Sequence, residues 1–261
     1  MNELYFSLAG AFVGFLVGMT GVGGGSLMAP ILVLGFGFAP TMAVGTDLWF
    51  ATFTKIVGGV VHRRFGSPDW KVIGRLAMGS VPGAVLTLVY LGLFNGGKLQ
   101  SDVLMKLLGG MLVLTAILVP VKHMVHAPLD QVRTLLGKHL RPTQLGLTIA
   151  SGFLIGSLVT LTSIGAGALV AVVLMLLYPL RLSARSLVGS DIVHAIPLAL
   201  IAAIGHSFLG NVDWHLLGLL LIGSIPGVIA GSFAAGRVRE TYVRLALAAM
   251  LAFSGVKMLM G

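Results

Sequence analysis

The chain has 261 residues, of which 57% are hydrophobic and 10% charged, and it carries a formal net charge of +9. A soluble domain has about 25% charged residues, so this composition excludes a water-soluble globular protein and predicts an all-α polytopic membrane protein. The absence of cysteine excludes a disulfide framework and thiolate chemistry.

Apolar runs that predict membrane helices follow one another along the whole chain. A helix needs about 20 apolar residues to span the hydrocarbon core, and four of the predicted segments are short. The segments are 4–20, 26–36, 41–61, 71–94, 103–121, 144–160, 167–180, 186–205, 214–235 and 241–260. A polar connector at 122–143 separates a first transmembrane repeat, 1–121, from a second repeat, 144–261.

Glycines interrupt the chain between the first two segments, in the sequence GVGGGSLMAP at 21–30. Glycine costs a helix interior about 1 kcal/mol relative to alanine, and one helix through both segments would be roughly 50 Å long. The sequence therefore predicts a break, which is either a tight turn between two short spans or the tip of a re-entrant hairpin.

Basic residues orient the segments by the positive-inside rule. With the N-terminus outside, most lysines and arginines fall in cytoplasmic loops, including the 122–143 connector. Lys98, Lys106 and Lys257 remain outside, and so does the C-terminus. The positive net charge is thus mainly an orientation signal, and we expect no nucleic-acid partner.

The second half of the chain repeats the first at a shift of 144 residues. GTD at 45–47 falls on GSD at 189–191, and GSVPG falls on GSIPG. An insertion of about six residues near 157–163 brings Gly18 onto Gly156. With five segments in each half, the second copy is upside down in the membrane. We therefore predict two inverted-topology repeats around a midplane site, as in many secondary transporters.

The broken segments are the predicted substrate site, because free backbone N–H groups and helix termini bind anions. Irregular backbone at membrane depth is tolerated only where it is buried in protein or lines a cavity. The alternative is that the glycines only allow close helix packing. The candidate glycines are Gly21, Gly23, Gly24, Gly25, Gly165 and Gly167.

The motifs GVGGGSLMAP, AVGTDL and GSVPGA, with their weaker second copies, resemble the sulfite-exporter (TauE/SafE) family, also called the toluene-sulfonate uptake permease family. The resemblance covers essentially the whole chain. It implies a bacterial inner-membrane carrier of sulfur-containing anions such as sulfite, sulfonates or sulfo-organic acids, with no cofactor. The second copy departs from the pattern, since SIGAGAL at 163–169 replaces GVGGGSL.

Charged side chains inside the spans are functional candidates by default. At 1.5 Å per residue, Lys55 lies near mid-membrane, and Asp47 and Asp191 flank it on opposite sides, roughly 15 Å apart along the axis. Lys55 is the predicted partner of the anion, because an ammonium supplies charge and three donors. The alternatives are that Lys55 snorkels to the interface or pairs with Asp47.

Asp47, Asp191 and His194 are candidates for proton coupling or gating, since histidine titrates near neutral pH. The alternatives are helix capping by the aspartates and a carbonyl hydrogen bond for the histidine. His206 is expected at the membrane interface, and Asp69 and Asp213 are expected to start helices. Hydroxyl candidates for binding anion oxygens, which could instead bond their own helices, are Ser26, Thr46, Ser163 and Ser190.

The function predicted from these features is an alternating-access secondary transporter for a small sulfur-containing anion, in contact with the lipid bilayer. The sequence contains no H-E-x-x-H motif and no nucleophile elbow, so we expect neither an enzyme nor a metal site. A passive anion channel, a membrane scaffold and a carrier for another small organic anion are the alternatives. Export, uptake with protons and the oligomeric state stay open.

Overall fold

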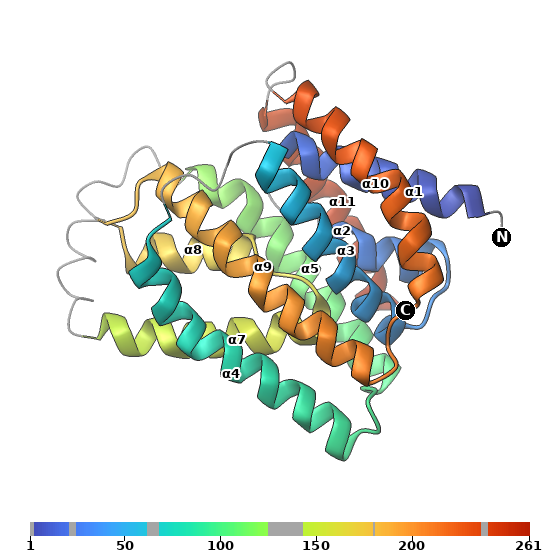
Figure 1. The fold of residues 1–261 in the computed structure, drawn as a ribbon, viewed down its shortest axis with the longest axis horizontal. Coiled ribbons are helices and arrows are strands. Elements are labelled where there is room, and N and C mark those ends of the chain that lie inside the picture. The colour runs from blue at the N-terminus through green and yellow to red at the C-terminus, as the bar shows by residue number, and fades with distance from the viewer. Residues whose placement is uncertain (1–2, 21–24, 62–67, 125–142, 180, 236–239) are drawn as a thin grey trace.

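The computed structural model describes residues 3–20, 25–61, 68–124, 143–179, 181–235 and 240–261 (Figure 1). Within these ranges the chain is built of helices and contains no β-strand. The elements are α1 (Glu3–Thr20), α2 (Gly25–Pro30), the π-helical turn η1 (Ile31–Gly35), α3 (Pro40–Val61), α4 (Trp70–Phe94), α5 (Ser101–Met124), α7 (Gln144–Thr162), α8 (Ala168–Leu177), α9 (Ala184–Phe208), α10 (Trp214–Ala234) and α11 (Glu240–Met260).

The predicted all-helical architecture is confirmed, and the helix bounds follow the predicted segments closely. Seven of the described helices are long and apolar enough to cross a membrane: α1, α4, α5, α7, α9, α10 and α11. α2 has 6 residues and α8 has 10, so neither spans the hydrocarbon core by itself. These two short helices follow α1 and α7, where the sequence predicts broken segments.

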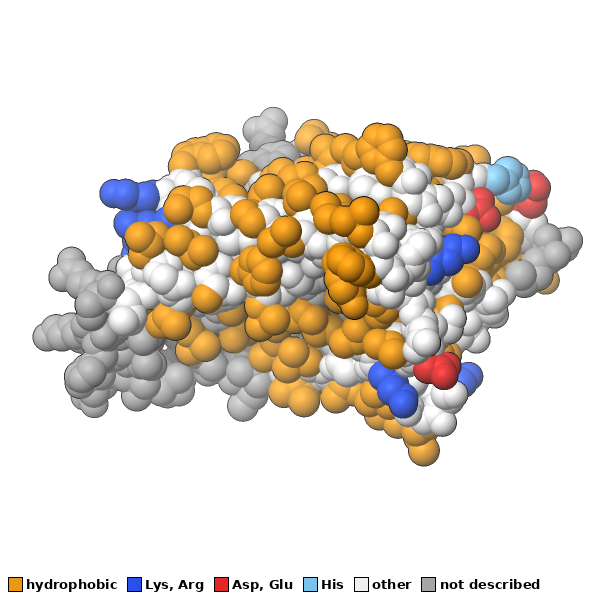
Figure 2. Space-filling model, turned by 90° about the horizontal axis from the view of Figure 1, so that it is seen from below, with side chains coloured by type: hydrophobic (Ala, Val, Ile, Leu, Met, Phe, Trp, Pro, Cys, Tyr) orange, Lys and Arg blue, Asp and Glu red, His pale blue; other side chains and the backbone are white. Residues whose placement is uncertain are grey.

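The surface has an apolar middle and polar ends. On the face shown in Figure 2, hydrophobic side chains cover the middle of the molecule and charged side chains lie at its two ends. Large apolar side chains such as Phe94 and Phe233 are 74% exposed. This distribution is typical of a protein whose sides contact lipid and whose ends contact water.

Helix pairs join the two halves of the sequence. α1 lies against α10, and α4 lies against α7 on the other side of the molecule (Figure 1). α5 packs against α11, and α3 packs against α9. Each partner in these pairs comes from a different half of the chain, so the halves interlock and do not form two separate bodies.

Glycine brings the backbones of the α4–α7 and α1–α10 pairs into contact. A methyl group at Gly79 would overlap the carbonyl oxygen of Ile149, and one at Gly223 would overlap that of Ser7. Small residues at such crossings allow close van der Waals packing, which drives helix association in lipid. Equivalent backbone contacts are made by Gly83, Gly152 and Gly156 in one pair and by Gly10, Gly14, Gly18, Gly227 and Gly231 in the other.

The packing corrects one detail of the predicted repeat alignment. Gly156 contacts Ser80 and Gly14 contacts Ser224, so the two glycines occupy equivalent positions in the two pairs. The serines match at 224 − 80 = 144 residues, whereas the glycines match at 156 − 14 = 142 residues. The predicted match of Gly18 with Gly156 is therefore wrong, and a two-residue difference replaces the six-residue insertion.

Aspartates begin α4 and α10, as predicted. The Asp69 carboxylate accepts hydrogen bonds from two backbone N–H groups in the first turn of α4, at 3.1 and 3.2 Å. The Asp213 carboxylate accepts one from the first turn of α10, at 2.9 Å. These bonds satisfy donors that a helix start leaves unpaired. Trp70 and Trp214, which follow, are exposed in the way expected of interfacial anchors.

Candidate functional site

The polar residues predicted inside the spans meet where α3 packs against α9. Asp47 in α3 is 0% exposed, Asp191 in α9 is 7% exposed and His194 in α9 is 2% exposed. Lys55, in α3, is partly buried. Its ammonium lies within electrostatic range of both aspartates, with the larger effect from Asp191. Lys55 also acts on His194. We call these four residues the charged cluster.

Helical spacing explains how two helices supply the charged cluster. Asp47 and Lys55 are eight residues apart, with Ala51 between them on the same ridge of α3. Asp191 and His194 are three residues apart and share a face of α9. Because α3 and α9 pack together, the two faces meet, and Lys55 acts on both aspartates.

The Asp47 carboxyl is buried without a hydrogen bond from any residue that the structure describes. Neither oxygen has a partner among the residues that the structure describes. The nearest donors are the Ser163 hydroxyl and the Ala29 backbone N–H, but neither closes a bond of ordinary geometry. The Ser163 hydroxyl is itself buried and unpaired within the described part of the chain. Two polar groups from different halves of the sequence therefore face each other with unused hydrogen-bonding capacity.

The break between α7 and α8 positions Ser163 toward the charged cluster. Ser163 ends α7 in the left-handed region at φ 58°, and Gly165 follows at φ 105°. The Gly165 conformation is one that residues with a Cβ rarely adopt, which explains why glycine stands there. Gly167 then precedes the first turn of α8. The structure thus brings Ser163 close to Asp47 of α3, while the predicted contact of Gly165 and Gly167 with substrate stays a prediction.

His194 has a partner that the sequence reasoning missed. The Ser80 hydroxyl of α4 lies 2.8 Å from His194 Nε2. Nδ1 of the same ring is buried and has no partner among the described residues. Ser80 lies in the GSVPG motif, which the sequence analysis interpreted as part of the repeat, so its serine was not predicted to contact His194. The repeat does mark His194 as particular to the second half, because Phe50 stands at the matching position in α3.

Thr46 and Ser190 both accept hydrogen bonds from the start of a neighbouring helix. The Thr46 hydroxyl accepts from the Asp213 backbone N–H at 3.1 Å. The Ser190 hydroxyl accepts from the Asp69 backbone N–H at 2.9 Å. Both residues adjoin the charged cluster in sequence, and each hydroxyl keeps its hydrogen to donate, so their predicted contact with substrate stays a prediction.

Part of the predicted site lies outside the described residues. Gly21, Gly23 and Gly24 fall there, and Gly25 and Ser26 are described only as the first residues of α2. In the described ranges, no group of three or more His, Asp or Glu side chains is arranged to hold a metal ion. The site is therefore defined by the charged cluster and the α7–α8 break.

His206 lies near the end of α9, as expected, and it is buried within the protein. It is 3% exposed, and its Nε2 lies 2.9 Å from the Thr160 carbonyl oxygen. Asn211 Nδ2 lies 3.3 Å from Nδ1 and donates to the Gly97 carbonyl at 2.6 Å. Depth counted along α9 placed His206 near a helix end, but the 95–100 segment and α7 cover that end.

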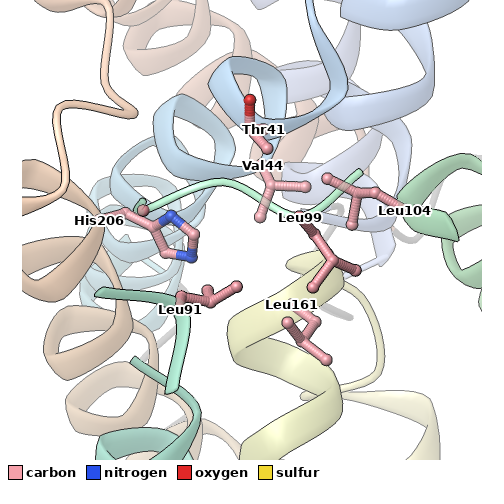
Figure 3. Close-up of a pocket in the computed structure, with 8 residues that line it drawn as sticks. Thr41, Val44, Leu91, Leu99, Leu104, Leu161 and His206 are labelled. Atoms are coloured by element: carbon pink, nitrogen blue, oxygen red, sulfur yellow. The ribbon is translucent and has the colours of Figure 1, made fainter. Parts of the chain in front are cut away.

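A small cavity adjoins His206 (Figure 3). Its volume is about 10 Å³, which is close to the space of one water molecule. It contains no residue of the charged cluster and is too small for a sulfur oxyanion. The lining residues are Thr41, Val44, Leu91, Gly97, Leu99, Leu104, Leu161 and His206.

Polar contacts tie the end of α8 to α4 and α7. The Arg181 guanidinium donates to both carboxylate oxygens of Asp69, at 2.5 and 2.9 Å. These bonds hold the pKa of Asp69 below its ordinary value. The Tyr178 hydroxyl lies 2.9 Å from the Thr148 hydroxyl and accepts a bond from Arg75 at 3.4 Å. The short helix is therefore anchored at its end by an ion pair and a hydroxyl network.

In the first half, aromatic rings pack together after η1, where the second half has the polar contacts after α8. Phe6 of α1 matches Thr148 of α7 at the 142-residue shift that the packing of these two helices defines. Phe36 follows η1 as Tyr178 follows α8. The Phe6 and Phe36 rings have centroids 4.9 Å apart, and Phe38 lies 5.8 Å from Phe6. Aromatic rings therefore pack at the end of η1, whereas an ion pair and a hydroxyl network hold the end of α8.

Comparison with known proteins places this architecture in a family. The sequence profile described as "Sulfite exporter TauE/SafE" matches residues 6–258. The probable membrane transporter protein YjnA of Bacillus subtilis is 37% identical over 97% of this chain and 98% of its own length. YdhB of the same organism, also named a probable membrane transporter protein, is 31% identical over 95% of this chain and 96% of its own.

A more distant relative has a name of the same kind. The probable membrane transporter protein MJ0441 of Methanocaldococcus jannaschii is 25% identical over 97% of this chain and 94% of its own length. No solved structure matches the chain. The family profile covers almost the whole sequence and confirms the resemblance seen in the motifs. The chain is a multi-pass membrane protein that belongs to the sulfite exporter TauE/SafE family of membrane transporters.

Proposed function

We propose that the protein is a secondary transporter that moves a small sulfur-containing anion across the bacterial inner membrane by alternating access. The substrate is sulfite, a sulfonate or a sulfo-organic acid. The observation that carries this proposal is the charged cluster, in which Lys55 interacts with both aspartates and Asp47 lies near Ser163 of the α7–α8 break, within a family described by sulfite export. Both termini lie outside and the 122–143 connector lies in the cytoplasm.

Lys55 supplies the charge that selects an anion. An ammonium offers three hydrogen-bond donors to sulfite or sulfonate oxygens. The Ser163 hydroxyl, unpaired among the described residues, offers a further donor from the opposite half of the chain. A charged side chain at this depth is expensive and marks a transport pathway in membrane proteins. The match of Lys55 in the second half is Ala199, so the site is asymmetric.

Interlocked helix pairs favour a particular division of the moving parts. The α1–α10 and α4–α7 pairs have backbones in contact at several glycines, so sliding them would lose close packing at many points. α2 and α8 are short and follow breaks, and α3 and α9 carry the charged cluster. We therefore assign the fixed part of the transporter to the interlocked pairs. Movement of α3, α9 or the end of α8 against these pairs requires that their hydrogen bonds to the pairs break.

Ligand-dependent unfolding of the purified protein tests the anion site. The panel is sulfite, sulfate, thiosulfate, methanesulfonate and acetate, each with wild type, Lys55→Met and Lys257→Met. A ligand at a hundred times its dissociation constant stabilises by about 2.7 kcal/mol, which raises the unfolding temperature by several degrees. Sulfur anions are expected to stabilise wild type and Lys257→Met but not Lys55→Met. Lys257 is a fair control because it is an exposed lysine near the end of α11.

Flux in proteoliposomes separates a carrier from a channel. A carrier exchanges labelled anion faster when unlabelled anion is present on the opposite side, whereas a channel shows no such acceleration. Saturable, trans-stimulated flux of a sulfur anion supports the proposal. Absence of stabilisation and of flux for every sulfur anion contradicts it.

A further inference from the structure

The Asp47 carboxyl has an environment that suits the neutral acid better than the anion. It is fully buried, and neither oxygen accepts a hydrogen bond from any described group. Burying an ionised carboxylate costs far more than burying a neutral polar group with the same surroundings. The Ser163 hydroxyl and the Ala29 N–H lie close enough to bond the carboxyl after a small movement.

The charge balance of the cluster leads to the same conclusion. Lys55 contributes one positive charge, and Asp47 and Asp191 would contribute two negative charges, so the empty cluster would be net negative with His194 neutral. Such a site repels the anion that Lys55 is meant to hold. A proton on one carboxyl balances Lys55 against the other and removes this repulsion.

Asp191 is the carboxylate that balances Lys55. It is the first electrostatic partner of Lys55, ahead of Asp47, and it retains 7% exposure whereas Asp47 has none. Of the two carboxyls, Asp47 is therefore the one that carries the proton in this conformation.

Other titratable groups on the helices around α3 do not change this assignment. Among the described side chains, Lys55 is the charged group that acts on Asp47. Among the side chains that the structure describes, the titratable residues on the elements that pack against α3 are Glu3 and Tyr5 of α1, Asp102 and Lys106 of α5, Asp191, His194 and His206 of α9, and Asp213 and His215 at the start of α10. Lys122, His123 and Arg185 also belong to these helices, but their side chains lie outside the described part. Of these, Asp191 and His194 interact electrostatically with Lys55.

We infer that one proton, held on the Asp47 carboxyl, crosses the membrane with each anion. This inference rests on the proposed function and adds the coupling ion to it. On the loading side, the Asp47 carboxylate takes a proton from water, and the anion binds at Lys55. After the movement, Asp47 returns the proton to water on the other side as the anion leaves, so no oxidant or other reactant is needed.

Proteoliposomes that contain a trapped pH-sensitive dye test the coupling. Methanesulfonate and sulfate are the probes, because neither carries a proton near neutral pH. An imposed anion gradient is expected to drive protons in the direction of the anion in wild type, at about one proton per anion. The Asp47→Asn variant keeps a neutral side chain of the same shape, so exchange of labelled for unlabelled anion is expected to continue while proton movement is lost.

Two further variants make the result specific. Asp191→Asn is expected to slow anion flux but keep the proton coupling, and Asp102→Asn, at an exposed position in the first turn of α5, is expected to change neither. Wild-type anion flux without proton movement overturns the inference and leaves the proposed function intact. Proton movement that persists in Asp47→Asn also overturns it. If no sulfur anion crosses in wild type, the proposed function fails and this inference fails with it.

Discussion

Thr46 in α3 accepts a hydrogen bond at 3.1 Å from the backbone N–H of Asp213, the residue that caps α10. The matching pair, Ser190 and Asp69, makes the same bond at 2.9 Å between α9 and the start of α4. Thr46 matches Ser190, and Asp69 matches Asp213, at the 144-residue shift. The two helices that carry the charged cluster are thus each tied, next to an aspartate of that cluster, to a helix of the interlocked pairs.

Replacing Thr46 by valine is expected to destabilise the protein by about 1–3 kcal/mol, because the Asp213 N–H loses its partner while the side-chain volume is kept. Thr52→Val is the matched control. Thr52 is a buried threonine of the same helix, but its hydroxyl donates only to Leu48 of that helix, so its loss is expected to have little effect. Unfolding temperatures in one detergent compare the two variants. Equal destabilisation by both contradicts a specific role for the Thr46 bond.

Alanine at Gly79 or Gly223 is expected to destabilise the protein by about 1–3 kcal/mol, since the added methyl overlaps a carbonyl oxygen of the facing helix. The repeat supplies matched controls at Gly74 and Gly218, where a Cβ meets nothing within 4 Å. Alanine at the controls is expected to be neutral or stabilising by up to about 1 kcal/mol. Unfolding temperatures of the four variants check this, and a destabilised Gly74→Ala would show that helix position rather than contact decides the effect.

The Asp69–Arg181 ion pair is expected to make stability depend on acid pH. Arg181 lowers the pKa of Asp69 in the folded state, so the pair stabilises the protein above the unfolded-state pKa of Asp69. This stabilisation is lost as the pH falls through the lower folded-state pKa. The pair is partly exposed, with Arg181 43% and Asp69 17% accessible, so its contribution is about 1 kcal/mol or less.

Arg181→Gln is expected to remove this acid-dependent part of the stability and to leave the N-cap of α4 in place. Unfolding temperatures measured from neutral to acid pH compare the variant with wild type. The two curves are expected to differ at neutral pH and to converge in acid. A constant difference between them at every pH would show that Arg181 acts by packing and not through the charge of Asp69.

Sequence reasoning located the helices and named all four residues of the charged cluster, because both depend on local patterns. Apolar runs fix where a membrane helix lies, and the spacing of Asp47, Lys55 and Asp191 along α3 and α9 fixes their depth. The contribution of Ser80 was missed because it depends on α4 lying beside α9, a contact between residues 114 positions apart. The burial of His206 was missed for a related reason, since position along one helix does not show which segments cover its end.

The Ser80–His194 contact predicts a difference between two matched serines. Ser80→Ala removes the partner of a buried imidazole nitrogen and is expected to destabilise the protein by about 1–3 kcal/mol. Ser224 occupies the matching position, is also fully buried, and has a hydroxyl without a partner in the described part of the chain. Ser224→Ala is therefore expected to be neutral or stabilising, because it removes an unsatisfied buried group.

Transport separates a positioning role of Ser80 from a purely structural one. If Ser80 holds the His194 ring beside Lys55, Ser80→Ala is expected to weaken apparent anion affinity and shift the pH dependence of flux, and Ser80→Thr is expected to restore both. Ser224→Ala serves as the control for each measurement. A Ser80→Ala variant with lowered stability but an unchanged affinity and pH profile would show that the hydrogen bond supports the packing of α4 on α9 and that His194 acts independently of it.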